Sequence, residues 1–182
     1  MPTRKGFLQG YNTQVAITAD QVIVAVQVGQ STTDQGSFVP MMHAAPDAAS
    51  LLHAHTGNAD LMIGTLLADA GYASDANFAA PGPSRLLALG KNRDPLKAAH
   101  LTPATGPPPL NATPRQAMAH RLRTTEGADL YKRRGATVEP GIGNLKKIID
   151  RFSRRGLEKA HSEAQLAATA FNLMKTHRAR AA

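Results

Sequence analysis

The sequence has no cysteine and no tryptophan, and aromatic residues make up only 4% of its 182 residues. Without cysteine, disulfides and thiolate metal sites are excluded. No run of about 18 apolar residues occurs, so a transmembrane helix is not expected. Residues 1–6 have no apolar signal-peptide core behind them. We therefore expect a cytoplasmic protein, not bound to a membrane, whose core relies on Val, Leu, Ile and Ala.

The whole chain has a formal net charge of +8, and the positive charge is concentrated in its second part. Residues 1–112 contain six Lys or Arg against seven Asp or Glu, whereas residues 113–182 contain fifteen against six. Lys and Arg release condensed counterions when they neutralise phosphates, so this asymmetry favours a polyanionic partner. A solvated basic surface would explain the charge equally well.

Hydrophobic periodicity predicts strands first. Residues 11–18 alternate, and valines repeat at period two over residues 22–28, which is typical of strands with one buried face. The short link, residues 19–21, predicts a hairpin. A helix is expected from Gln35 to about His55, and Pro40 must either lie in its first turn or break it.

A second group of elements follows. Residues 61–68 predict a buried strand that ends at Asp69, and Ser74 is expected to cap a helix that runs to about Ala80. Residues 86–89 predict another buried strand. The proline-rich residues 92–114 are expected to form a loop or an insertion.

Two helices are expected after the proline-rich segment. One apolar stripe consists of Val138, Ile142, Leu145, Ile149 and Phe152. A last helix, from residue 157 to about 177, is expected to bury Ala160, Ala164, Ala167, Phe171 and Met174. The order β-β-α-β-α-β, loop, α-α predicts a single α/β domain.

Two carboxylates stand out by position. Asp69 closes an apolar strand, and the carboxyl ends of strands in open α/β sheets are where reactive groups collect, although turn chemistry alone explains many such residues. Glu139 and Lys146 lie two turns apart on one helix face, suited to an extended ligand such as a phosphodiester backbone, or simply to a solvated flank. Because Pro140 disfavours helical geometry at Glu139, the helix is expected either to start at Pro140 or to be kinked there.

Several short motifs, in their order and spacing, resemble the DDE transposases of bacterial insertion sequences. They are Gly10-Tyr11-Asn12-Thr13-Gln14-Val15-Ala16, Thr33-Asp34-Gln35-Gly36, Asp69-Ala70-Gly71-Tyr72, Tyr131 with Arg134, Glu139 and Lys146, and Phe171-Asn172-Leu173-Met174-Lys175. The resemblance covers nearly the whole chain except the proline-rich segment. It departs from the commonest signature in one place, since four residues rather than three separate Arg134 from Glu139.

The resemblance implies a ribonuclease-H-like mixed sheet with flanking helices, and metal-dependent DNA strand cleavage and transfer. Asp69 and Glu139 would be catalytic and would ligate Mg²⁺ or Mn²⁺. Tyr131, Arg134 and Lys146 would contact DNA phosphates. The implied partners are transposon ends, target DNA and full-length transposase subunits.

The family's first catalytic Asp would sit on a strand before residue 11, where no acidic residue occurs, and neither Asp20 nor Asp34 matches its motif position. We therefore expect a truncated domain, lacking its first strand, that is weak or inactive alone. One alternative is a non-catalytic DNA-binding or transposase-interacting module that acts as an inhibitor. Another is a nonfunctional product that never folds stably.

Overall fold

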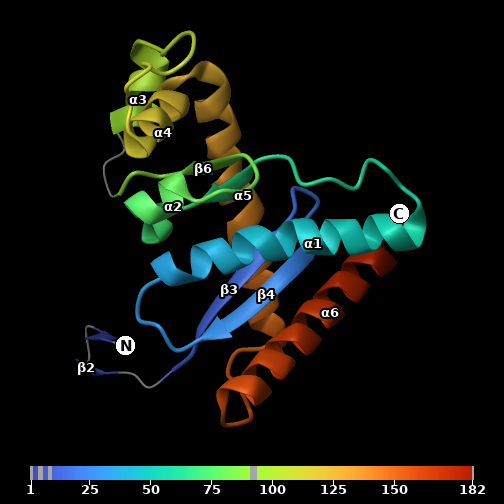
Figure 1. Ribbon diagram of the computed structural model, residues 1–182. Helices are drawn as coiled ribbons and strands as arrows, with labels where there is room; N and C mark the ends of the chain where they lie inside the picture. The colour runs from blue at the N-terminus through green and yellow to red at the C-terminus, as the bar shows by residue number, and fades with distance from the viewer. Residues whose placement is uncertain (1, 4–5, 8–9, 91–93, 182) are drawn as a thin grey trace.

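The computed structural model describes residues 2–3, 6–7, 10–90 and 94–181 (Figure 1). Its strands are β1 (Pro2–Thr3), β2 (Gly6–Phe7), β3 (Asn12–Ile17), β4 (Ile23–Gly29), β5 (Leu66–Ala68) and β6 (Arg85–Leu87). Its helices are η1 (Gln35–Ser37), α1 (Phe38–Thr56), η2 (Ala70–Tyr72), α2 (Asp75–Ala79), α3 (Asp94–Leu101), α4 (Pro114–Arg123), α5 (Thr125–Ile148) and α6 (Leu157–Ala181). The fold is mixed α/β and mostly helical, which confirms the predicted α/β class.

The predicted first hairpin is confirmed. Strands β3 and β4 pair antiparallel, with Val15 opposite Val26. Gln21 closes the turn with a φ of 63°, and its side-chain amide donates a hydrogen bond of 2.6 Å to the Thr137 carbonyl on α5. The hairpin is thereby tied to the helix that carries Glu139.

Helices α1 and α6 flank this hairpin, and α5 runs behind it (Figure 1). The core on the α6 side consists of Ile23, Leu145, Ala167, Ala168 and Phe171. The prediction that Met174 is buried was wrong, because its exposed fraction is 44%. Asn172 already contacts Ile23, the first residue of β4, so α6 passes the end of the strand before it reaches Met174.

Strands β5 and β6 form a short parallel pair, with Leu67 opposite Leu86. The strand predicted over residues 61–68 is shorter than expected, because the chain turns at Met62, whose amide donates to the Asp60 carbonyl. Met62 is 80% exposed. A second core packs around this pair; it consists of Phe38, Met42, Phe78, Leu86, Leu87, Met118, Leu122 and Tyr131.

The proline-rich segment is not a loop throughout. Residues 94–101 form α3, since a proline is tolerated in the first turn of a helix and Leu96, Ala98 and Ala99 are strong helix formers. Residues 102–113 are irregular, as predicted. Residues 91–93 lie outside the described part of the chain.

Helix α5 does not start at Pro140, so that alternative was wrong. Thr124 caps the helix far upstream, accepting a hydrogen bond of 3.0 Å from the Gly127 amide. Pro140 lies inside α5 and is exposed, so its ring faces solvent. The helix ends at Ile148, and Phe152 packs after it, edge-on against Tyr11 at 5.6 Å between ring centroids. The apolar stripe predicted over residues 138–152 therefore leaves the helix after Ile148.

A single continuous sheet was implied by the resemblance. Within the described residues, β3–β4 and β5–β6 are instead separate pairs. Helix α5 packs against both β3 and β5 and so joins them.

Candidate active site

Asp69 lies directly after β5, at the carboxyl end of the parallel pair. Its Oδ1 accepts a hydrogen bond of 2.8 Å from the Gly71 amide, so Asp69 caps the short helix η2. The side chain is exposed. Asp69 therefore has the turn role that its position predicted, and it also presents a carboxylate where parallel strands end.

Tyr131 connects α5 to this strand end. The residue is buried, at 8% exposure, and its hydroxyl donates a hydrogen bond of 3.2 Å to the Ala68 carbonyl, 63 positions away in the sequence. Burial raises the pKa of Tyr131; the nearby Arg134 opposes this shift and the Asp69 carboxylate adds to it. Tyr131, one of the predicted site residues, thus fixes the backbone of Ala68, the residue directly before Asp69.

Arg134 lies against Tyr131 one turn further along α5. Its guanidinium carbon is 5.8 Å from the centroid of the Tyr131 ring, within cation–π range. Its Nε atom is buried and has no hydrogen-bond partner in the described part of the chain. The arginine is half-buried, so its orientation is set by packing rather than by an ion pair.

A cavity of about 590 Å³ lies where these groups meet. Its lining includes Asp69 from the β5 end and Tyr131, Lys132, Arg134 and Gly135 from α5. Two motifs that are distant in the sequence, around Asp69 and around Tyr131, therefore share one cavity that is rimmed by cationic side chains.

Glu139 extends the same face of α5 by one turn. Its Oε1 lies 3.6 Å from the position that a Cβ on Gly135 would occupy, so the carboxylate folds back toward the cavity-lining glycine. Glu139 and Lys146 are both exposed on α5. The structure thus brings Asp69, Tyr131 and Arg134 to one cavity, whereas Glu139 lies one turn further along α5 and Lys146 two turns beyond Glu139.

The donor chemistry of this region suits a hard cation only in part. Carboxylate oxygens are the ligands that Mg²⁺ prefers. Among residues 10–90 and 96–181, however, no group of three or more His, Asp or Glu side chains is close enough to hold a metal ion. Asp69 and Glu139 each offer carboxylate oxygens of the right kind, but they do not belong to a ready-made metal cluster within these residues.

Four residues that form a hydrogen-bond network beside the Asp69 turn were not predicted as site residues. Asp34 accepts hydrogen bonds at its Oδ1 from Asn12 at 2.7 Å and from Gln14 at 2.8 Å. Tyr72 donates to the Gln14 side-chain oxygen. Burial, followed by the charges of Asp34 and Asp69, raises the pKa of Tyr72 to about 12. The available signal was Gln14, a polar residue buried at 7% exposure within an alternating strand.

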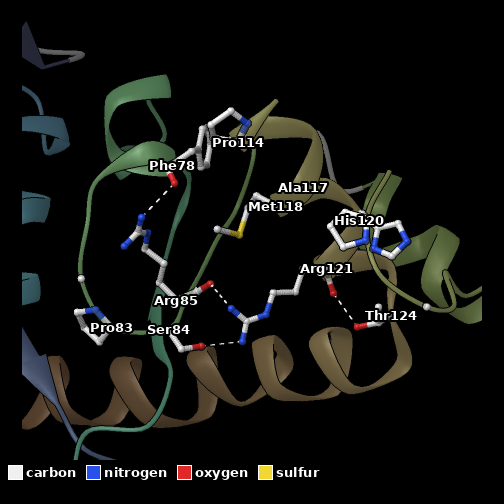
Figure 2. A pocket seen from close by; sticks show the side chains of 13 residues that line it. Phe78, Pro83, Ser84, Arg85, Pro114, Ala117, Met118, His120, Arg121 and Thr124 are labelled. Carbon is white, nitrogen blue, oxygen red and sulfur yellow. Dashed lines mark hydrogen bonds between the residues drawn. The ribbon is translucent and has the colours of Figure 1, made fainter. Parts of the chain in front are cut away.

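A second cavity, of about 430 Å³, lies between α2, β6 and α4 (Figure 2). Figure 2 shows Arg121 reaching from α4 to the Ser84 hydroxyl at 2.7 Å and to the Arg85 carbonyl at 3.1 Å. The Arg85 guanidinium donates to the carbonyls of Phe78 and Ala80 at the end of α2. The hydrogen bonds of these two arginines thus hold α2 and α4 against the β6 segment.

Comparison with known families agrees with the motif reading. The family model described as the transposase DDE domain matches residues 106–177, which include Tyr131, Arg134, Glu139 and Lys146. The match confirms the resemblance over this stretch, less than half of the chain, and indicates a transposase-related function with DNA as the partner. Asp69 lies before the matched residues. No curated protein and no solved structure matches the chain.

No helix in the described residues has both the length and the apolar character needed to cross a bilayer.

Proposed function

We propose that this chain performs, or contributes residues to, metal-dependent cleavage and transfer of DNA strands, as the DDE transposase resemblance implies. The observation that carries the proposal is the meeting of Asp69 with residues 131–135 of α5, one turn before Glu139. The Tyr131 hydroxyl holds the Ala68 carbonyl, and both segments line one cavity.

Asp69 and Glu139 are the proposed metal ligands. The Gly71 amide engages Oδ1 of Asp69 and so fixes the rotamer of this carboxylate. A bound divalent ion would supply Lewis-acid stabilisation of charge on the reacting phosphate and would lower the pKa of the attacking water. Because the described residues contain no group of three or more acidic or histidine side chains that could hold a metal ion, we expect the isolated chain to cleave DNA weakly or not at all.

The basic residues of α5 are the proposed contacts to DNA phosphates. Arg134 can bind a phosphate with two parallel hydrogen bonds, and Lys146 can contribute a point charge further along the helix. The Tyr131 hydroxyl already donates its proton to Ala68, and a phosphate oxygen can only accept. Tyr131 is therefore proposed to support Arg134 through the contact of its ring with the guanidinium. A phosphate contact by the Tyr131 hydroxyl would require its hydrogen bond to Ala68 to break.

We also propose a ribonuclease-H-like origin for the fold, as one domain with an irregular segment over residues 102–113. The support is that one helix, α5, packs on both strand pairs and carries the Glu139 side of the site. The two pairs could belong to one sheet if a further strand lay between them.

The test is nicking of supercoiled DNA by the purified chain in Mg²⁺ or Mn²⁺, beside an Asp69→Ala/Glu139→Ala double variant. Asp47→Ala, an exposed carboxylate on α1, is the charge control. Nicking that is lost only in the double variant supports the proposal. Equal nicking by all three proteins would refute the assignment of these carboxylates.

A second function, a DNA-binding module without catalysis, is favoured by the incomplete acidic set. It predicts that the double variant binds DNA as tightly as the wild type, while loss of Arg134 or Lys146 weakens binding. Binding without nicking under any metal condition would select this alternative.

A further inference from the structure

Asp34 lies at the centre of a polar network that bridges the hairpin and the turn carrying Asp69. The network begins on β3, where the side-chain amides of Asn12 and Gln14 both donate to Oδ1 of Asp34. Gln14 also donates to the Asn12 side-chain oxygen at 2.9 Å. The network ends on η2, where the Tyr72 hydroxyl donates to the side-chain oxygen of Gln14. One carboxylate therefore organises groups from β3 and, through Gln14, from the segment after β5.

The other oxygen of Asp34 approaches the Asp69 turn directly. A Cβ built on Gly71 would lie 2.8 Å from Oδ2 of Asp34 and 3.0 Å from Oδ1 of Asp69. The two carboxylate oxygens are therefore no further apart than the sum of these distances. Only a glycine permits this approach without displacing one of them.

Gln35, in η1 after β4, also links the two segments: its side-chain amide donates to the Ala73 carbonyl at 3.0 Å, and its own carbonyl accepts from Asn77 at 2.9 Å. Strands β3 and β5 belong to separate sheets, and α5 is the helix that packs on both. The Gln35 contacts lie at Ala73 and Asn77, so the hydrogen bonds of Asp34 and Gln14 are the ones that tie β3 itself to the turn carrying Asp69. One oxygen of Asp34 accepts from both side-chain amides of β3, so a single acceptor atom holds Asn12 and Gln14 together.

We propose that Asp34 is a positioning residue for Asp69, holding Asn12, Gln14 and, through Gln14, Tyr72, so that the Asp69 turn stays fixed against the β3–β4 hairpin. The effect of Asp34 on catalysis rests on the proposed function. Its effect on the position of the Asp69 turn does not. Asp34 acts through its hydrogen bonds, and its charge is secondary.

Two substitutions separate hydrogen bonding from charge. Asp34→Asn keeps an acceptor oxygen for the two amides and removes the charge, whereas Asp34→Ala removes both. Asp47→Ala on α1 is the matched control for loss of an exposed carboxylate. Tyr72→Phe cuts the network at its far end and leaves both carboxylates in place.

The first measurement is amide hydrogen exchange at Gly71, whose N–H is bonded to Asp69, with the buried α6 residue Phe171 as an internal reference for global stability. Losing a hydrogen bond to a charged group is expected to speed exchange at Gly71 by about tenfold in Asp34→Ala. Tyr72→Phe should act in the same direction, whereas Asp34→Asn and Asp47→Ala should stay close to wild type. Exchange at Phe171 should not change.

The second measurement is the rate of Mn²⁺-dependent DNA nicking, which should fall in Asp34→Ala and be rescued by Asp34→Asn. If Asp34→Asn is as damaging as Asp34→Ala in either assay, the charge rather than the hydrogen bonds matters and the positioning role is refuted. Unchanged exchange at Gly71 in Asp34→Ala refutes it as well. A wild-type chain that does not nick DNA bears on the proposed function alone, because the exchange measurement still decides the role of Asp34.

Discussion

The side-chain amide of Asn172 on α6 makes both backbone hydrogen bonds of Ile23, the first residue of β4. Its Oδ1 accepts from the Ile23 amide at 2.9 Å, and its Nδ2 donates to the Ile23 carbonyl at 2.8 Å. The Asn172 side chain therefore takes the place of a neighbouring strand for one residue at the edge of the hairpin. Both backbone groups would be left unpaired at a partly buried site if this side chain were removed.

Replacing Asn172 should therefore destabilise the fold. Asn172→Ala is expected to lower the free energy of unfolding by about 1–3 kcal/mol, because a donor and an acceptor lose their partners. The measurement is urea unfolding followed by circular dichroism. Asn144→Ala, an exposed asparagine on α5, is the control and should change stability by less than about 0.5 kcal/mol. Equal effects of the two substitutions would show that the Ile23 bonds contribute little.

Two glycines of α5 should respond in opposite directions to the same substitution. A Cβ on Gly127 would overlap the Arg121 carbonyl oxygen at the junction with α4, whereas nothing lies within 4 Å of a Cβ on Gly143. Gly127→Ala should cost about 1–3 kcal/mol through overpacking. Gly143→Ala should stabilise the helix by about 0.5–1 kcal/mol. Thermal unfolding of both variants measures this, and a stabilised Gly127→Ala variant would contradict the packing.

The periodic elements could be predicted from the sequence, because one buried face leaves a clear pattern. The hairpin of β3 and β4 and the α6 face through Phe171 followed from such patterns. The start of α5 could not be predicted, since Pro140 favours a break locally, and the cap at Thr124 and the buried Tyr131 outweigh it. The length of β5 was also missed, because a turn at Met62 shortens an apolar run.

The candidate site was predictable only as separate motifs. Asp69 and Tyr131 were singled out by resemblance, but their meeting depends on a side-chain bond to the Ala68 carbonyl that no local pattern encodes. Asp34 was weighed only as a missing ligand. Its hydrogen bonds to Asn12 and Gln14 join positions about twenty residues apart, and they arise from tertiary packing of β3 against the loop after β4.

Alkaline pH should destabilise the protein partly through Tyr72. The pKa of Tyr72 is about 12 in the folded protein against 10.0 for an unperturbed tyrosine, because burial and the charges of Asp34 and Asp69 disfavour the phenolate. The folded state then retains a proton that the unfolded state loses between these values. The stabilising contribution is complete below pH 10 and is lost as the pH rises toward 12.

Tyr72→Phe should remove this share of the pH dependence. The free energy of unfolding of the variant should fall less steeply than that of wild type above pH 10, and the two slopes should agree below it. Part of the slope should remain in the variant, because the pKa of Tyr131 is raised as well. Denaturant titrations across this pH range measure the slopes, and identical slopes above pH 10 would contradict a buried, charge-flanked Tyr72.

DNA affinity should depend on salt through Arg134 and Lys146. Each phosphate contact contributes a slope of about −0.9 to the logarithm of affinity against the logarithm of salt concentration on duplex DNA. Arg134→Gln and Lys146→Gln should each reduce the slope by about that amount and weaken binding equally for unrelated sequences. Fluorescence anisotropy over a salt series measures both effects. Arg115→Gln is the control, because Arg115 is paired with Asp75 at 3.1 Å on the α2–α4 side. If Arg115→Gln lowers the slope as much as the α5 variants, DNA is attracted by net charge alone, and α5 is not its binding face.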